Sequence, residues 1–500
     1  MRKYLLFILV FITIGLPALA AASETATSRY YTSIQKNPQK IKKFMFDMPK
    51  GGDLHNHASG STFAENLLKY AENDNLCVQR TTFVVYMNTE CKPGDILNLA
   101  IQDVSFKDAL IDAWSMQHFQ GGQESGHDHF FNTFRKFNAI THHHTGEILA
   151  EIVDRAAKQN ELYVETMLTP DGNASGKLGK KLGWDRDFPS MRAKLLANNF
   201  SEIVAGMTTY LNDAEAKMRS ELQCGTANAK PGCRIALRYQ YQVAREQPPE
   251  MVFAQLLAGF EGASKDKRII GINMVQPEDG RISMGNYRLH MQMVRYLHNV
   301  YPKVHISLHA GELSQELVPA EGLKFHINDA VTIAGAERIG HGVDIMFEDN
   351  YPQLLKYMAD NHVMVEINLS SNAGILKVEG KNHPLPLYMQ YGVPVALSTD
   401  DEGISRDIMT TEYVKAVSMY QIDYLTLKNM VRNSISYAFI PGDNLWHGHD
   451  YKKVDSSCRG DLGMRQPSKK CKKFLASSEK AALQWELEKR FMEFENRFSN

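Results

Sequence analysis

Short apolar runs of strand length alternate with longer amphipathic stretches along most of the chain. Residues 147–158, 287–299 and 350–360 place apolar side chains at helical spacing, which predicts helices there. Strands are predicted around them, at residues 52–59, 162–169, 235–242, 269–275, 304–309, 338–343, 363–369 and 393–399. Alternating strands and helices predict a parallel sheet, and eight such strands favour a (β/α)8 TIM-type barrel over a doubly wound sheet.

Two parts of the chain extend this barrel. The segment at residues 60–161 is too long for a simple connection, so we expect a long helical insertion after the first strand. Its Phe-rich stretch at residues 130–137 is consistent with a lid over one end of the barrel. Residues 479–497 repeat apolar side chains at helical spacing, which predicts extra C-terminal helices. We therefore expect an N-terminal arm at residues 23–48 and a single barrel domain at residues 49–500.

The first 22 residues have the pattern of a secretory signal peptide. Arg2 and Lys3 precede an almost wholly apolar run, and a stretch of mostly small residues ends at Ala22. This pattern predicts cleavage near Ala20 or Ala22. The alternative is an uncleaved membrane anchor, which is disfavoured because the apolar run is short for a bilayer span. The sequence thus predicts a secreted or periplasmic protein with no membrane attachment after cleavage.

The six cysteines support export, because an even number of cysteines in an exported chain indicates disulfides. They form three local pairs in segments of loop-like composition, namely Cys77 with Cys91, Cys224 with Cys233, and Cys458 with Cys471. Spacing alone does not fix the connectivity, since six cysteines allow fifteen pairings. No C-x-x-C motif is present, so a thiolate zinc site or a thioredoxin-like centre is disfavoured.

Composition and charge narrow the choice of partners. The chain is 43% hydrophobic and carries 56 Lys+Arg against 57 Asp+Glu, for a formal net charge of -1. That balance gives no bulk electrostatic reason to bind nucleic acid or an anionic membrane. A small-molecule partner is therefore expected, and a homodimer stays open.

Histidines and carboxylates gather at the predicted carboxyl ends of four strands. The first strand carries His55 and His57, whose spacing puts both imidazoles on the same strand face. His309 ends the fifth predicted strand, and Glu312 follows three residues later. The sixth strand contains Gly340-His341-Gly342, and the eighth is followed by Asp400-Asp401.

Each of these motifs alone has a simpler explanation. H-x-H occurs by chance, His341 would serve as a hydrogen-bonded structural residue, and Asp400-Asp401 would cap a helix. Their common placement changes the balance, because all four motifs lie where barrel enzymes build their sites. Three imidazoles and one carboxylate are also a donor set that suits Zn²⁺.

The motifs H-x-H, S-L-H-A-G-E, G-H-G and S-T-D-D, in this order, resemble the adenosine deaminase family of the amidohydrolase superfamily. The resemblance extends from residue 49 to residue 405. The signal peptide and the cysteines make the chain similar to the secreted, growth-factor-related branch or its bacterial counterparts. The resemblance implies zinc-dependent hydrolytic deamination of adenosine, and of 2′-deoxyadenosine, by attack of water on purine C6, which releases ammonia.

The resemblance also implies roles for individual residues. One zinc ion per chain would be held by four of them, His55, His57, His309 and Asp400. Glu312 falls on the proton-transferring glutamate of the family, and His341 falls on the histidine that orients the attacking water. Asp401 falls on the carboxylate that contacts the imidazole edge of the purine.

Three departures from the family pattern bear on the substrate. Ser59 stands where many members have an aspartate that holds the ribose 5′ hydroxyl. Gln276 stands where the family often has a glycine near purine N3, and Glu402 stands where a proline is common. Ser59 and Gln276 are therefore kept as candidate substrate contacts, while the metal ligands follow the family pattern.

Two alternatives remain from the sequence. The same machinery would act on another purine, such as an adenine nucleotide or a modified adenosine, although no dense Arg/Lys cluster adjoins the motifs to bind a phosphate. A catalytically silent extracellular binding or growth-factor-like protein would instead show an eroded ligand set, which this chain does not have. The cytidine-deaminase type of zinc site is excluded because it needs a C-x-x-C motif.

Overall fold

The computed structural model describes residues 16–87, 90–92, 94–462, 464 and 466–499. At its centre lies a parallel sheet of eight strands, hydrogen-bonded in the order in which they occur along the chain. These strands are β1 (Gly51–His57), β4 (Glu161–Leu168), β5 (Ala236–Ala244), β6 (Ile269–Val275), β7 (His305–Ala310), β8 (Arg338–His341), β9 (Met364–Ile367) and β10 (Val395–Leu397). A parallel bridge between Asn56 and Asp400 brings the end of the sheet back to β1. The predicted (β/α)8 TIM-type barrel is confirmed, and every predicted strand overlaps an observed one.

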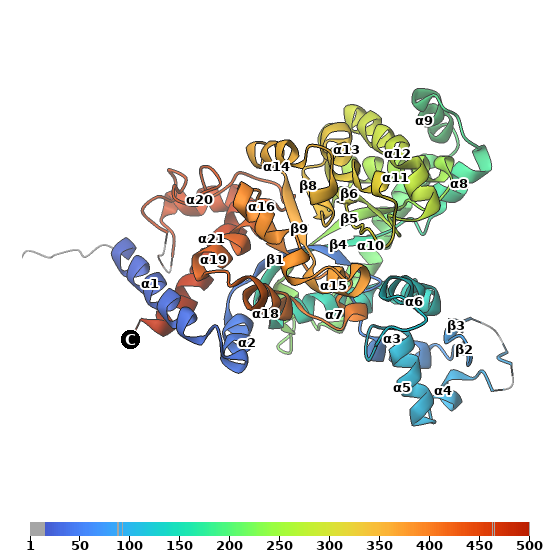
Figure 1. Cartoon of the computed structure of the whole chain (residues 1–500), viewed down its shortest axis with the longest axis horizontal. Helices are drawn as coiled ribbons and strands as arrows, with labels where there is room; N and C mark the ends of the chain where they lie inside the picture. The colour runs from blue at the N-terminus through green and yellow to red at the C-terminus, as the bar shows by residue number, and fades with distance from the viewer. Residues whose placement is uncertain (1–15, 88–89, 93, 463, 465, 500) are drawn as a thin grey trace, which may run out of the picture.

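Helices cover the outside of the barrel (Figure 1). They are α8 (Ala174–Leu182), α9 (Phe188–Leu196), α10 (Phe200–Glu221), α11 (Pro249–Lys265), α12 (Arg281–Val300), α13 (His326–Asp329), α14 (Tyr351–Asp360), α15 (Leu369–Leu376), α16 (Leu385–Tyr391), α17 (Glu402–Ser405), α18 (Met409–Tyr420) and α19 (Tyr424–Ser436). α11 is buried over most of its length because α8, α10 and α12 pack around it as well as the strands β5 and β6. The predicted helices at residues 287–299 and 350–360 correspond to α12 and α14.

The interior of the barrel contains a buried ionic network as well as apolar side chains. Arg338 on β8 contacts Glu165 on β4 through Nη2 (2.5 Å) and Glu366 on β9 through Nε (2.7 Å). All three side chains are almost completely buried. A buried charge is tolerated when it is paired and hydrogen-bonded, and these pairs join three strands across the interior of the barrel.

The insertion between β1 and β4 packs against one side of the barrel. Its buried apolar side chains, such as Leu67, Phe106, Trp114 and Phe137, form a second hydrophobic cluster that also includes Val343, Ile375, Leu376 and Ile404 of the barrel. It comprises α3 (Ala64–Asn73), β2 (Cys77–Gln79), β3 (Val84–Tyr86), α4 (Leu97–Ala100), α5 (Val104–Ala113), α6 (Gly126–Thr141) and α7 (Thr145–Lys158). The antiparallel pair β2–β3 is an addition to the predicted all-helical insertion. Strands of three residues are too short for their periodicity to be recognised in the sequence.

The two ends of the chain pack together on the opposite side of the barrel (Figure 1). Helices α1 (Leu16–Ile34) and α2 (Pro38–Asp47) lie near α21 (Glu479–Glu495), which is preceded by α20 (Lys469–Ser477). Lys428 of α19 joins these elements, because its Nζ donates to Glu24 (2.7 Å) and to Glu495 (2.6 Å). The predicted arm at residues 23–48 is thus helical. Residues 1–15 of the predicted signal peptide lie outside the described residues, and the two predicted cleavage positions fall within α1.

All three local cysteine pairs form disulfides. The Cα atoms are 5.4 Å apart in Cys77–Cys91, 5.6 Å in Cys224–Cys233 and 4.7 Å in Cys458–Cys471. Each bond closes a short excursion of the chain, which restricts the unfolded state more than the folded one. Among the described residues, we find no helix with the length and apolar character that a bilayer span requires.

Candidate active site

Four predicted metal ligands converge at the carboxyl end of the barrel. His55 and His57 come from β1, His309 comes from β7, and Asp400 follows β10; their donor atoms all lie within 4.8 Å of one another. His309 Nε2 is 3.1 Å from His55 Nε2 and 3.2 Å from His57 Nε2. Asp400 Oδ1 is 3.2 Å from His57 Nε2 and 3.6 Å from His55 Nε2. Tetrahedral zinc ligands are separated by about 3.3 Å, so this spacing fits a zinc ion.

The outer hydrogen bonds of two imidazoles fix where their lone pairs point. His55 Nδ1 lies 2.7 Å from the Glu366 carboxylate, and His309 Nδ1 lies 2.8 Å from Asn273 Oδ1. Both partners accept, so each neutral ring carries its proton on Nδ1 and presents a bare Nε2 to the other ring. Two facing lone pairs repel unless a cation lies between them, and such outer partners are typical of metal-ligating histidines. The donor set therefore fits a metal ion by its chemistry as well as by its spacing.

Glu312 and His341 lie beside the four ligands. His341 Nε2 is 3.7 Å from Glu312 Oε1 and 3.8 Å from Asp400 Oδ2, and Nε2 has no hydrogen-bond partner. Burial raises the pKa of Glu312 to about 8, and the charge of Asp400 adds to the rise. Burial lowers the pKa of His341 to about 3. In this environment a neutral carboxyl and a neutral imidazole face the same point, an arrangement suited to proton transfer near neutral pH.

The turn that carries Glu312 is held by the loop that follows β6. Glu278, which is buried, accepts from the backbone N–H of Gly311 at 3.0 Å and from that of Glu312 at 2.9 Å. His326 Nδ1 lies 2.5 Å from the same carboxylate. The backbone position of Glu312 is therefore defined by side-chain contacts to a neighbouring loop.

Three predicted site residues have backbones in the left-handed region. The φ angles are 71° at His341, 58° at Asp400 and 79° at Gln276. Residues with a Cβ seldom adopt this conformation, and those that do often lie at functional sites. In each case the unusual backbone directs the chain out of a barrel strand and toward the site.

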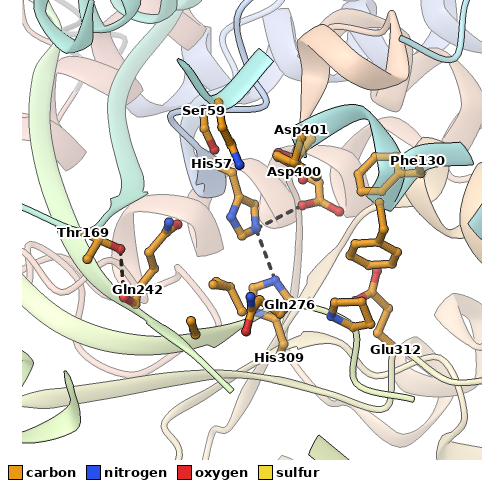
Figure 2. Close-up of a pocket in the computed structure, with 16 residues that line it drawn as sticks. His57, Ser59, Phe130, Thr169, Gln242, Gln276, His309, Glu312, Asp400 and Asp401 are labelled. Atoms are coloured by element: carbon orange, nitrogen blue, oxygen red, sulfur yellow. Dashed lines mark hydrogen bonds and ion pairs between the residues drawn. The ribbon is translucent and has the colours of Figure 1, made fainter. Parts of the chain in front are cut away.

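A cavity of about 360 Å³ opens above these groups (Figure 2). Its floor includes His57, His309, Glu312 and Asp400. One wall is aromatic and comes from α6 of the insertion, which contributes Phe130, Phe131 and Phe134. α6 also contributes Asn138, and the remaining polar lining comes from Ser59, Thr169, Gln242, Gln276 and Asp401. The insertion therefore supplies part of the cavity wall, as predicted for its Phe-rich stretch.

The predicted substrate contacts all line this cavity. The Oδ1 atom of Asp401 is buried without a partner, and burial together with the charge of Asp400 raises the pKa of Asp401 well above its ordinary value. A Cβ at Gly60 would lie 1.6 Å from that Oδ1, so Gly60 leaves the space that Asp401 occupies. Gln276 uses its Oε1 to accept from the backbone N–H of Glu246 (2.9 Å), which leaves its amide nitrogen for other contacts.

Sequence reasoning missed the residues that orient the site. Glu366 and Asn273 hold two of the imidazoles, Glu278 holds the Glu312 turn, and Asn372 contacts His341 Nδ1 at 2.9 Å. The available signal was the presence of polar residues inside apolar strands, as at Asn273 in β6 and Glu366 in β9. Such a residue indicates a buried polar group, but the sequence does not show which side chain it contacts.

Comparison with known proteins agrees with this geometry. The family model for adenosine deaminase matches residues 80–446. Curated adenosine deaminases from Clostridium acetobutylicum and Pectobacterium atrosepticum are 31% and 33% identical over 137 residues, which is 27% of this chain and 38% and 37% of the relatives. The matched region thus covers less than half the length of each of these relatives.

Solved structures show a shared fold at low identity. The apo N6-methyl-AMP deaminase of Arabidopsis thaliana superposes with a TM-score of 0.53 at 20% identity, covering 80% of this chain and 94% of that one. An Arabidopsis ADAL structure with IMP gives a TM-score of 0.52 at 19% identity, covering 79% and 94%. The family match begins after β1, so His55 and His57 are placed by the structure alone. With the family model covering most of the barrel, the chain belongs to the adenosine deaminase family.

Proposed function

We propose that this protein hydrolytically deaminates adenosine and 2′-deoxyadenosine, producing inosine or 2′-deoxyinosine and ammonia. One observation carries the proposal. Three buried imidazole nitrogens and one carboxylate converge beside Glu312 and His341 at the floor of a cavity with an aromatic wall. The family membership supports the same class of reaction.

His55, His57, His309 and Asp400 would hold a single zinc ion. When bound there, zinc would lower the pKa of a water ligand and so provide a nucleophile near neutral pH. The chain supplies the remaining steps. Glu312, protonated, donates to ring N1 while water attacks C6, and this keeps negative charge off the purine. As a carboxylate, Glu312 then takes up the proton of the attacking oxygen and passes it to the departing amino group, which leaves as ammonia; such transfers commonly contribute about 10²–10⁴-fold in rate.

His341 and Asp401 would orient the reacting groups. The Nε2 atom of His341 faces the same space as Glu312 and is free to hydrogen-bond to the attacking oxygen. Asp401 lines the cavity, and its carboxyl, whose Oδ1 has no hydrogen-bond partner, would contact the imidazole edge of a purine. Phe130, Phe131 and Phe134 offer apolar surface to the face or edge of the base.

The lining favours a nucleoside over a nucleotide. No lysine or arginine is among the described residues that line the cavity, so a 5′-phosphate would be placed there without a counter-charge. Ser59, Thr169 and Gln242 offer neutral hydrogen-bonding groups that suit ribose hydroxyls. The structures that resemble this fold include one with IMP, and a nucleotide substrate is therefore included in the test.

The test is a spectral assay of the purified full-length protein, loaded with zinc, against adenosine, 2′-deoxyadenosine, AMP and adenine. We expect absorbance changes with the two nucleosides, abolished by a chelator and restored by zinc. Glu312→Gln should retain zinc and lose most turnover, which separates the chemistry from metal binding. No reaction with any of the four compounds would reject the proposal, whereas AMP alone reacting would reject the substrate choice.

We further propose export to the periplasm or the extracellular space after cleavage near Ala20 or Ala22. The N-terminal pattern and the three disulfides support this, because disulfides persist in oxidising compartments. The N-terminal sequence of the mature protein from a cell fraction tests it. A chain that begins at Met1 in the cytosol would contradict it.

A further inference from the structure

A chain of buried hydrogen bonds leads from the first turn of α16 to His341. The backbone N of Leu385 lies 3.1 Å from His383 Nδ1, and His383 Nε2 lies 3.0 Å from Asn372 Oδ1. Asn372 Nδ2 in turn lies 2.9 Å from His341 Nδ1. The side chains of His341, Asn372 and His383 are at most 2% exposed, so water does not compete for these contacts.

Which atom donates in each of these hydrogen bonds follows from the first bond of the series, that of the Leu385 backbone N–H. Leu385 is the first residue of α16, and a backbone N–H there has no acceptor within the helix and is always a donor. His383 Nδ1 must therefore accept. Burial lowers the pKa of His383 to about 4, so this ring is neutral and carries its single proton on Nε2.

The orientation of Asn372 is then determined. Because His383 Nε2 donates, the atom of Asn372 that faces it is the carbonyl oxygen, and the amide nitrogen is left to face His341. Asn368 Nδ2 also lies on the same side, 3.5 Å from His341 Nδ1. With amide donors directed at Nδ1, that atom is the acceptor of the His341 ring.

We propose that Asn372 and His383 are positioning residues that fix the tautomer of His341, so that its Nε2–H is a hydrogen-bond donor to the oxygen that attacks purine C6. This rests on the proposed function. A donor that is already oriented stabilises negative charge as it develops on that oxygen, and no reorganisation is needed during the reaction. The opposite tautomer would direct a lone pair at the nucleophile.

Asn372→Asp is the sharpest variant, because it keeps the shape and reverses the polarity toward His341. One carboxylate oxygen would still accept from His383, while the other would require a proton on His341 Nδ1. We expect kcat to fall about 10²–10³-fold, the loss associated with removing one oriented donor, with KM and zinc content nearly unchanged. Asn433→Asp is the matched control, because Asn433 is also hydrogen-bonded on both sides but lies outside the cavity lining.

Two variants of His383 test the same proposal in case Asn372→Asp fails to fold. His383→Leu removes the donor that orients Asn372 and should lower kcat about tenfold, within the range found for outer partners of functional histidines. The amide of His383→Gln can still donate to Asn372, so most of the rate should return. Equal losses in both variants would show that His383 only fills space.

The tautomer itself is measured by ¹⁵N NMR of the zinc-loaded, histidine-labelled full-length protein, with His341→Gln identifying the resonances. A protonated Nε2 in the wild type and a shift of the proton to Nδ1 in Asn372→Asp are expected. A wild-type proton on Nδ1 would overturn the proposal. So would a shifted tautomer with kcat within about twofold of wild type. The wild-type spectrum does not depend on turnover, so an inactive wild type would reject the proposed function while this spectrum still decides the tautomer.

Discussion

Two parts of the site are held in different ways. The cage consists of the four candidate metal ligands, His55, His57, His309 and Asp400, and the aromatic wall consists of Phe130, Phe131 and Phe134. The cage residues lie on or shortly after strands whose positions are fixed by the parallel sheet, and the rings of His55 and His309 are held by Glu366 and Asn273. The wall residues lie on α6, which belongs to an insertion whose hydrophobic cluster also includes Val343, Ile375, Leu376 and Ile404 of the barrel. A close helix contact and the His127–Asp279 pair connect this helix to the barrel.

Because the two regions are held differently, we expect changes in them to affect different steps. Changes in the barrel should affect metal binding and the chemical step, whereas changes in the insertion should affect how well a substrate is held. In kinetic measurements the first kind of change appears in zinc content and kcat, and the second appears in KM. The variants below follow that division from the largest expected effect to the smallest.

Asp400→Asn should have the largest effect. It removes the negative charge from the cage and replaces one carboxylate oxygen with an amide, so zinc affinity and activity should both fall by more than about 100-fold. Zinc content after dialysis and kcat at saturating zinc measure the two losses. Full zinc occupancy with normal activity would show that Asp400 is not a ligand.

Glu366→Gln tests the shell that orients His55. The uncharged amide would hold the His55 ring less well and would make its Nε2 less basic, so zinc affinity should fall about 10–100-fold. Glu337→Gln is the control, because Glu337 also contacts a histidine ring, that of the partly exposed His305. An equal loss in both variants would remove the special role of Glu366.

The convergence of these residues was predictable from the sequence because two simple rules place them at one end of the barrel, while the choice of the four ligands among them came from the family resemblance. Side chains at i and i+2 share a strand face, and barrel enzymes build sites at the carboxyl ends of strands. Neither rule identifies Glu366 or Asn372, since their roles depend on which ring each one meets in the folded barrel. Ser59 and Gln276 do line the cavity, yet their contacts with a substrate stay predictions.

Gly126→Ala tests the insertion by moving α6. A Cβ at Gly126 would lie 2.1 Å from the backbone oxygen of Gly374, so α6 must shift away from α15 and carry its phenylalanines with it. We expect KM for adenosine to rise about tenfold, equal to about 1.4 kcal/mol of binding, with zinc content and kcat nearly unchanged. Gly206→Ala in α10 is the control, because a Cβ there meets nothing within 4 Å. A loss of zinc in Gly126→Ala would show that the insertion and the cage are not separate.

The smallest expected effect is a pH dependence of KM that comes from the insertion. His127 of α6 lies 3.0 Å from Asp279 through Nε2 and 3.0 Å from Asp128 through Nδ1, and both side chains of the first pair are largely buried. Burial alone lowers the pKa of His127, but the hydrogen bond to Asp279 and its charge outweigh burial and raise the pKa to about 9. Because the folded pKa exceeds the ordinary value of 6.5, the stabilisation is fully present below pH 6.5 and is lost as the pH rises through about 9.

The measurement is the ratio of KM values for His127→Gln and wild type across pH 6 to 10, which cancels titrations common to both proteins, such as that of Glu312. A neutral glutamine keeps a hydrogen bond to Asp279 but carries no charge. At pH 6 the KM of the variant should therefore be a few times higher than that of the wild type, and it should not change as the pH passes through about 9. The ratio should approach one above about pH 9.5, where the wild-type pair has also lost its charge. A ratio that stays constant across this range would mean that the pair does not hold the aromatic wall, and the contact at Gly126 and the apolar contacts of α6 with the barrel would then hold it.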